Sequence, residues 1–145
     1  MALMIRTSKV LLVLLVLSAL GAATAFAAAT MKIDPKKAEV GEWAFASASG
    51  LKSGRYGLIL VANARPTETG ACLAHLGKRR HTDDGHVYLG GKIPKRLTCY
   101  EGINQKLGTV KTLPGKYHLV VAVPVGPAGF KTSKSFVRRK FRVVR

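Results

Sequence analysis

Acidic residues are scarce in this chain. Its 145 residues include 7 Asp and Glu against 24 Lys and Arg, and the formal net charge is +17 at pH 7. General acid–base catalysis draws heavily on carboxylates, and the one adjacent pair, Asp83 and Asp84, precedes Gly85 in a sequence typical of a turn. A G-x-S-x-G nucleophile elbow is also missing. We therefore expect no enzymatic activity and no cofactor.

Aromatic residues are also few: the chain has 1 Trp, 5 Phe and 4 Tyr. Carbohydrate-binding modules usually present aromatic side chains as platforms for sugar rings. Trp43, Phe45 and Tyr56 fall in strand-like runs, and we expect all three in the core. A sugar-binding surface is therefore not expected. The aromatic interleaving of single-strand nucleic-acid binders is missing as well, so we expect no sequence-specific nucleic-acid recognition.

One long apolar run is present, and it lies near the start of the chain. Arg6 and Lys9 precede the uncharged stretch Val10–Leu20, and small-x-small motifs follow at residues 25–27 and 27–29. A positive segment, an apolar core and small residues at the end are the three parts of a secretory signal peptide. We predict a signal peptide over residues 1–29, with cleavage near Ala27 or Ala29.

Cleavage would leave one domain, residues 30–145, with no further membrane-spanning run. We expect it to be secreted or extracytoplasmic, at the cell surface or in the periplasm, and monomeric. The alternative is an uncleaved anchor, because residues 10–29 are uncharged and long enough to span a bilayer. The second half of that stretch is mostly Ala and Gly, which partition weakly into hydrocarbon.

The chain has only two cysteines, Cys72 and Cys99. An even number in an exported chain favours a disulfide, because the thiols mature in an oxidising compartment. Closing a loop of this length would stabilise the fold by roughly 3–4 kcal/mol in the chain-entropy model. Two free thiols or an intermolecular bridge are the alternatives.

Short segments with period-two patterning fill the rest of the chain. In Gly41–Asn63, two strand-like runs, Trp43–Ser49 and Arg55–Asn63, flank a glycine-bounded turn. Similar short runs follow at turn-punctuated intervals, and no helical period is evident. The pattern predicts an all-β fold, an antiparallel β-sandwich of about 7–9 strands.

Several short motifs resemble those of bacterial exported immunoglobulin-like domains. They are strand leads and turns: Glu39-Val40-Gly41-Glu42, Ser49–Gly54, Thr82–Gly85, Ile93-Pro94 and Leu113–Tyr117. The resemblance implies an immunoglobulin-like sandwich over residues 30–145 in which these motifs carry no catalytic role. Two features depart from antibody domains: Trp43 lies on an early strand, and Cys72 and Cys99 lie too late in the chain for the inter-sheet bridge.

Basic residues are the most informative surface feature. No acid occurs among residues 131–145, where Arg138, Lys140 and Arg142 would share one face of a strand, spaced by about 6–7 Å. We predict contacts with an anionic cell-envelope polymer, or with another protein. The predicted contact residues are Lys78, Arg79, Arg80, Arg138, Lys140 and Arg142. A solvated face without a partner is the alternative.

A metal site is the second functional hypothesis. Cys72-x-x-His75 and His81-x4-His86 have spacings that zinc or copper ligands can use. Because the disulfide would engage Cys72, an exported metal-binding protein would depend on His75, His81 and His86. A noncatalytic surface module remains the first prediction.

Overall fold

The computed structural model describes residues 28–62 and 71–145. The predicted signal peptide lies outside the described residues, except for Ala28 and Ala29. Within the described ranges the chain forms strands and turns without a helix, so no helix there could cross a membrane.

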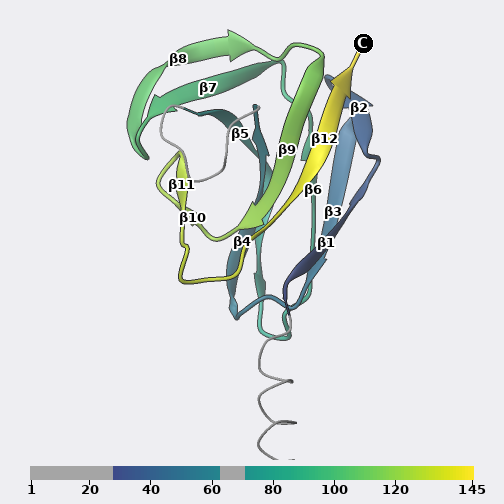
Figure 1. Cartoon of the computed structure of the whole chain (residues 1–145), viewed down its shortest axis with the longest axis vertical. Coiled ribbons are helices and arrows are strands. Elements are labelled where there is room, and N and C mark those ends of the chain that lie inside the picture. The colour runs from purple at the N-terminus through teal and green to yellow at the C-terminus, as the bar shows by residue number, and fades with distance from the viewer. Residues whose placement is uncertain (1–27, 63–70) are drawn as a thin grey trace, which may run out of the picture.

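Twelve strands form two large sheets and one small hairpin (Figure 1). The larger sheet has seven strands in the order β2-β12-β9-β4-β5-β7-β8. Their bounds are β2 Lys37–Glu39, β4 Gly54–Val61, β5 Cys72–Thr82, β7 Arg96–Glu101, β8 Gln105–Lys111, β9 Gly115–Ala122 and β12 Val137–Val144. Neighbours pair antiparallel except β2 and β12, which pair in parallel.

The smaller sheet has three antiparallel strands in the order β1-β3-β6. Their bounds are β1 Thr30–Asp34, β3 Trp43–Ser49 and β6 Val87–Lys92. Two-residue strands β10 (Pro124–Val125) and β11 (Gly129–Phe130) form the hairpin. The all-β prediction is confirmed, whereas the estimate of 7–9 antiparallel strands is too low and overlooks the parallel pair. The excess comes from strands of two or three residues, which are too short to produce a periodic pattern.

Pro35 divides the first strand-like segment between the two sheets. Residues Thr30–Asp34 pair with β3, and Lys37–Glu39 pair with β12 in the other sheet. Proline cannot donate to a ladder, so it suits a point where the chain leaves one sheet for another. Pro35 therefore marks the point where the chain passes from the smaller sheet to the larger one.

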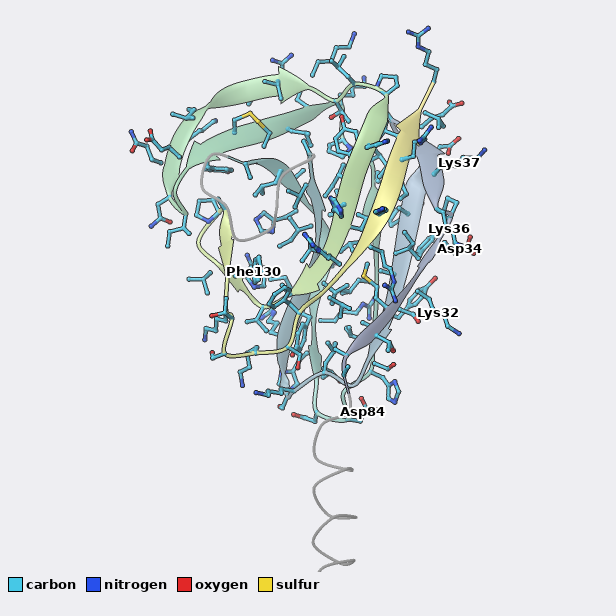
Figure 2. The ribbon with its side chains drawn as sticks, in the orientation of Figure 1. Lys32, Asp34, Lys36, Lys37, Asp84 and Phe130 are labelled. Atoms are coloured by element: carbon cyan, nitrogen blue, oxygen red, sulfur yellow. A yellow bond between two sulfur atoms is a disulfide. The ribbon has the colours of Figure 1, made fainter. Side chains whose placement is uncertain are left out.

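The two sheets pack face to face, and apolar residues also cover the far side of the larger one. Between the sheets, the alanines of β3 meet Leu58 and Leu60 of β4 and Leu119 of β9. On the outer side, Ile59 and Val120 belong to a second cluster, with Phe130 of the hairpin packed against it (Figure 2). Strands β4 and β9 are apolar on both faces because both faces are covered.

The β3 side chains point the opposite way from the prediction. Ala44, Ala46 and Ala48 face the core and are almost fully buried, whereas Trp43 is 49% exposed. Phe45 is only partly buried, so of the three aromatic residues expected in the core only Tyr56 is fully buried. Large and small residues alternate along β3 as the sequence predicts, but the face with the large residues lies on the outside of the sandwich.

Glycines allow the two sheets to approach closely where β5 crosses β6. Gly77 has a φ of 62°, and a Cβ there would collide with the carbonyl oxygen of Gly90. A Cβ on Gly91 would lie 2.5 Å from the Gly77 nitrogen. Backbone therefore meets backbone at this crossing, and only glycine fits.

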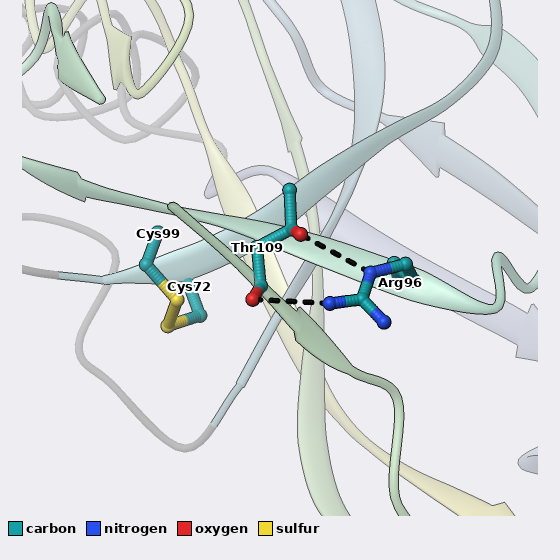
Figure 3. The surroundings of a disulfide bond; sticks show 4 residues. All are labelled: Cys72, Arg96, Cys99 and Thr109. Atoms are coloured by element: carbon teal, nitrogen blue, oxygen red, sulfur yellow. Dashed lines mark hydrogen bonds between the residues drawn. A yellow bond between two sulfur atoms is a disulfide. The ribbon is translucent and has the colours of Figure 1, made fainter. Parts of the chain in front are cut away.

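The disulfide between Cys72 and Cys99 is present (Figure 3). The two cysteines are direct cross-strand partners of β5 and β7, next to the pair Leu73 and Thr98. Cys72 lies at the start of β5, and Cys99 lies within β7. In the part of the chain that the structure describes, only these two residue pairs join β5 to β7. The disulfide therefore helps to hold the β7–β8 arm to the sheet.

The glycine crossing can be tested by adding one methyl group. Gly77→Ala should lower the free energy of unfolding by about 3 kcal/mol or more, because the methyl group must displace backbone that is already in contact. Gly102 is the matched control, since its φ is 65° and nothing lies within 4 Å of a Cβ there. Gly102→Ala should cost only about 1 kcal/mol of backbone strain. Equal losses for the two variants in denaturant unfolding would contradict the close crossing.

Candidate anion-binding face

Strand β12 carries a row of cations on one face. Arg138, Lys140 and Arg142 are exposed and occupy alternate positions, so their side chains leave the same side of the sheet. Between them on the opposite side, Phe141 and Val143 are buried in the core. The predicted ridge on the last strand is thus formed, and the buried residues hold its register.

Strand β9 adds two more basic groups to the same face. Lys140 lies opposite His118, and Arg142 lies opposite Lys116. On the other edge of β12, Lys37 is the register partner of Arg142. Three cations, Lys37, Arg142 and Lys116, therefore form one row across neighbouring strands. Like charges at paired positions destabilise a sheet, so this row lowers the stability of the fold.

Lys36 extends the basic face at the sheet edge. Its backbone carbonyl accepts a hydrogen bond from the Arg142 N–H at 3.2 Å. Figure 2 shows Lys36 and Lys37 together on the edge of the molecule beside β12. Lys36 and Lys37 thus join the basic face, although they lie about a hundred residues before β12 in the sequence.

Two shallow hollows flank Lys140. Both are lined by Lys36, His118 and Lys140, and one, of about 440 Å³, reaches along β12 to Arg138. The other, of about 330 Å³, reaches to Arg142 and includes Lys116. Neither lining includes an acidic residue from the part of the chain that the structure describes. The hollows are therefore suited to negatively charged groups.

His118 lies in the centre of this face. Burial, together with the positive charges of Arg138 and Lys140, lowers the pKa of His118 below its ordinary value of 6.5. Its Nδ1 is buried and has no hydrogen-bond partner among residues 28–62 and 71–145. Burial is the larger cause of this lowering, and the charges of Arg138 and Lys140 act in the same direction.

Arg139 has a different role from its neighbours. It points to the other side of β12, where its Nε donates a hydrogen bond to the Met31 carbonyl of β1 at 3.1 Å. The bond joins the two sheets at their open edge. Arg139 therefore ties the two sheets together and lies outside the alternating row, although it also lines the hollow that reaches to Arg138.

The second predicted cluster, Lys78, Arg79 and Arg80, lies elsewhere. These residues lie within strand β5, and strands β9 and β4 separate β5 from β12. All three are exposed. Because successive residues of a strand point to opposite faces, they cannot form one row. The structure does not bring the two predicted clusters together.

The three histidines of the metal hypothesis are also dispersed. His75 Nε2 lies 2.7 Å from the Pro127 carbonyl, and His81 Nε2 lies 2.8 Å from a carboxylate oxygen of Asp83. His86 follows the Asp83–Gly85 turn and lines a separate hollow. Within the described ranges, no group of three or more His, Cys, Asp or Glu side chains is placed to hold a metal ion.

Sequence reasoning missed four members of the basic face: Lys36, Lys37, Lys116 and His118. Lys36 and Lys37 are adjacent where β2 begins, Lys116 and His118 both lie in β9, and neither pair is near β12 in the sequence. Their relation to Arg142 and Lys140 depends on the pairing of β12 with β2 and β9. A prediction of those strand pairs would have shown the relation.

The charge environment of His118 can be tested by NMR titration of its imidazole. Replacing Arg138 and Lys140 with Gln should raise the pKa of His118, because two repulsive charges are removed, but burial should keep the pKa below 6.5. In the unaltered protein the folded imidazole binds a proton less readily than the unfolded one. Stability should therefore fall as the pH drops below about 6.5.

A control variant, Lys111→Gln on β8, removes a charge away from this face and should leave the pKa of His118 unchanged. An unchanged pKa in the double variant would show that Arg138 and Lys140 do not set the potential at His118.

The described fold was compared with known proteins. No protein-family model matches the chain, and no curated protein matches it. Among solved structures, macromomycin has a similar fold, with a TM-score of 0.57 and 14% sequence identity. The similarity covers 81% of this chain and 100% of the macromomycin chain. At this identity the likeness concerns the fold alone: the chain is an all-β, sandwich-like domain.

Proposed function

We propose that the chain is an exported, noncatalytic immunoglobulin-like module that binds anionic polymers of the cell envelope through the β12 face. The observation that carries this proposal is the alternating row of Arg138, Lys140 and Arg142, joined by Lys116 and His118 of β9. These groups share one sheet face without a nearby acid in the hollows. Glu39 of β2 lies at the end of the same face, beside Val144, but the face is predominantly cationic and therefore attracts negative charge.

An extended polyanion fits this face better than a single small anion. The cations repeat along β12 at about 6–7 Å, so consecutive charges of a polymer can meet consecutive side chains. The hollows on either side of Lys140 are shallow, and they are too open to surround a small anion. Binding of a polyanion by such a row releases counterions and weakens as salt rises. Phosphate-bearing or sulfate-bearing polymers have the required charge.

The strand arrangement supports the immunoglobulin-like assignment. In immunoglobulin folds the first, second and fifth strands share one sheet, and the third, sixth and seventh share the other. Here β1, β3 and β6 form one sheet, and β4, β9 and β12 are adjacent in the other. The β7–β8 arm and the β10–β11 hairpin are additions to that arrangement.

A tyrosine near the start of β9 provides independent support. The Tyr117 hydroxyl donates a hydrogen bond to the Leu113 carbonyl, four residues upstream, at 2.6 Å. Immunoglobulin-like folds have a tyrosine of this kind at the start of the corresponding strand. Tyr56 makes the same type of bond to the Lys52 carbonyl at 2.7 Å at the start of β4.

The disulfide supports export. A bond between Cys72 and Cys99 persists in oxidising compartments and is rare in reducing ones. Together with the predicted signal peptide at residues 1–29, it favours a secreted or extracytoplasmic location. The envelope polymers that such a protein meets are commonly anionic.

The proposal is tested by salt elution from immobilised heparin, used as a defined sulfated polymer. The triple variant Arg138→Gln, Lys140→Gln and Arg142→Gln should elute at clearly lower salt than the unaltered protein. Each lost contact reduces the slope of log affinity against log salt by roughly 0.7–0.9. The matched control replaces Lys78, Arg79 and Arg80 with Gln and makes the same change in net charge.

The control variant should elute close to the unaltered protein. Equal shifts for both triple variants would show that only the net charge matters, and elution that does not depend on salt would contradict electrostatic binding altogether.

A further inference from the structure

Three aromatic side chains form a row on the outer face of the three-stranded sheet. The rings of Trp43 and Phe45 lie 5.7 Å apart between centroids, with 11° between their planes. Those of Phe45 and Tyr88 also lie 5.7 Å apart, with 9° between their planes. The three rings are therefore stacked on one another with Phe45 in the middle, and the stack runs from β3 to β6.

A glycine positions the central ring. Gly90 lies directly opposite Phe45 in the pairing of β3 with β6. A Cβ on Gly90 would collide with the Phe45 ring, so the ring lies over bare backbone. Phe45 is thereby held between Trp43 and Tyr88, and the row is fixed before any ligand arrives.

Polar groups border the row on both neighbouring strands. Lys32, Ser47 and Tyr88 are cross-strand neighbours in β1, β3 and β6, and Lys92 lies opposite Trp43. Asp34 lies opposite Phe45 on β1. Figure 2 shows Lys32 and Asp34 extending outward from the β1 edge. Hydrogen-bonding groups therefore lie within reach of anything that covers the rings.

The row ends in a hollow lined by both polar and apolar groups. It has a volume of about 480 Å³, and its lining includes Tyr88, the hydroxyls of Thr30, Ser47 and Ser49, and His86. Thr30 Oγ1 and Ser49 Oγ are 2.9 Å apart and hydrogen-bonded. Aromatic surface and hydroxyl-rich surface are thus continuous along this face.

The size of the patch favours a narrow ligand. Trp43 is 49% exposed and Tyr88 is 60% exposed, so with Phe45 they present on the order of 300 Å² of aromatic surface. Partners in a stable protein complex each bury about 800 Å². Because the patch is well below that size, a second protein or a second copy of this chain is a poor fit.

We propose that this face binds a polysaccharide of pyranose sugars. The apolar C–H face of a sugar ring packs against an aromatic ring, and the sugar hydroxyls exchange hydrogen bonds with charged and hydroxyl side chains. Trp43 and Tyr88, the exposed ends of the stack, supply the first kind of surface, and Lys32, Ser47 and Lys92 supply the second. This site is separate from the basic β12 face, because the outer faces of two packed sheets point in opposite directions.

Trp43 is the only tryptophan in the chain, so its fluorescence reports on this face alone. The probes are soluble hexasaccharides of β-1,4-linked glucose, β-1,4-linked N-acetylglucosamine and α-1,4-linked glucose. With at least one probe, the Trp43 emission should shift to shorter wavelength and quenching by acrylamide should fall, since the sugar shields the indole from water. If none of them changes emission or quenching at millimolar concentrations, the proposal is overturned.

Tyr88→Ala tests the row while leaving the Trp43 reporter in place. The variant should bind the same sugar about tenfold more weakly, the loss expected for one stacking contact. Leu107→Ala is the matched control, because Leu107 on β8 is also 60% exposed, and it should bind as the unaltered protein does. Equal affinity in Tyr88→Ala would overturn the proposal.

The triple β12 variant separates this inference from the proposed function. It should retain full sugar affinity while losing heparin affinity, and Tyr88→Ala should do the reverse. Loss of sugar affinity in the β12 variant would show that the sugar binds at the basic face and would overturn the aromatic site.

Discussion

The close approach of the two sheets is the constraint on which the rest of the structure depends. At the crossing of β5 and β6, Gly77 and Gly90 bring backbone against backbone. A close approach of this kind favours small inward side chains on β3, which packs in one core cluster with Leu58 and Leu60 of the larger sheet. The alanines of β3 therefore face the core, and Trp43 is left on the outside. The exposed aromatic row is a consequence of how the core is packed.

The two outer faces of the sandwich have different chemistry. The β12 side of the larger sheet carries cations in register across three strands, at some cost in stability. The smaller sheet carries aromatic rings bordered by polar groups. Fold alone does not specify function, so the binding role of each face depends on the residues that it carries. The two proposed contacts point away from each other and do not compete for one surface.

Period-two patterning was enough to predict an all-β fold, and the presence of only two cysteines was enough to predict the disulfide partners, because neither inference requires knowing how the strands pair. Patterning could not decide which face of β3 is buried, since both faces contain apolar residues and the answer depends on how the two sheets pack together. The ridge of Arg138, Lys140 and Arg142 was predictable because its members lie on one strand. Lys116 and His118 were not, because they join it only through strand pairing.

The central claim is that anionic polymers bind at the β12 face, and NMR titration of the 15N-labelled protein with polyphosphate tests it most directly. The account predicts that the largest amide shift changes occur in β12 and in β9 around His118, with small changes at Lys78–Arg80 and at the Trp43 indole. Largest changes at Lys78–Arg80, or changes of equal size at every exposed basic residue, would contradict it.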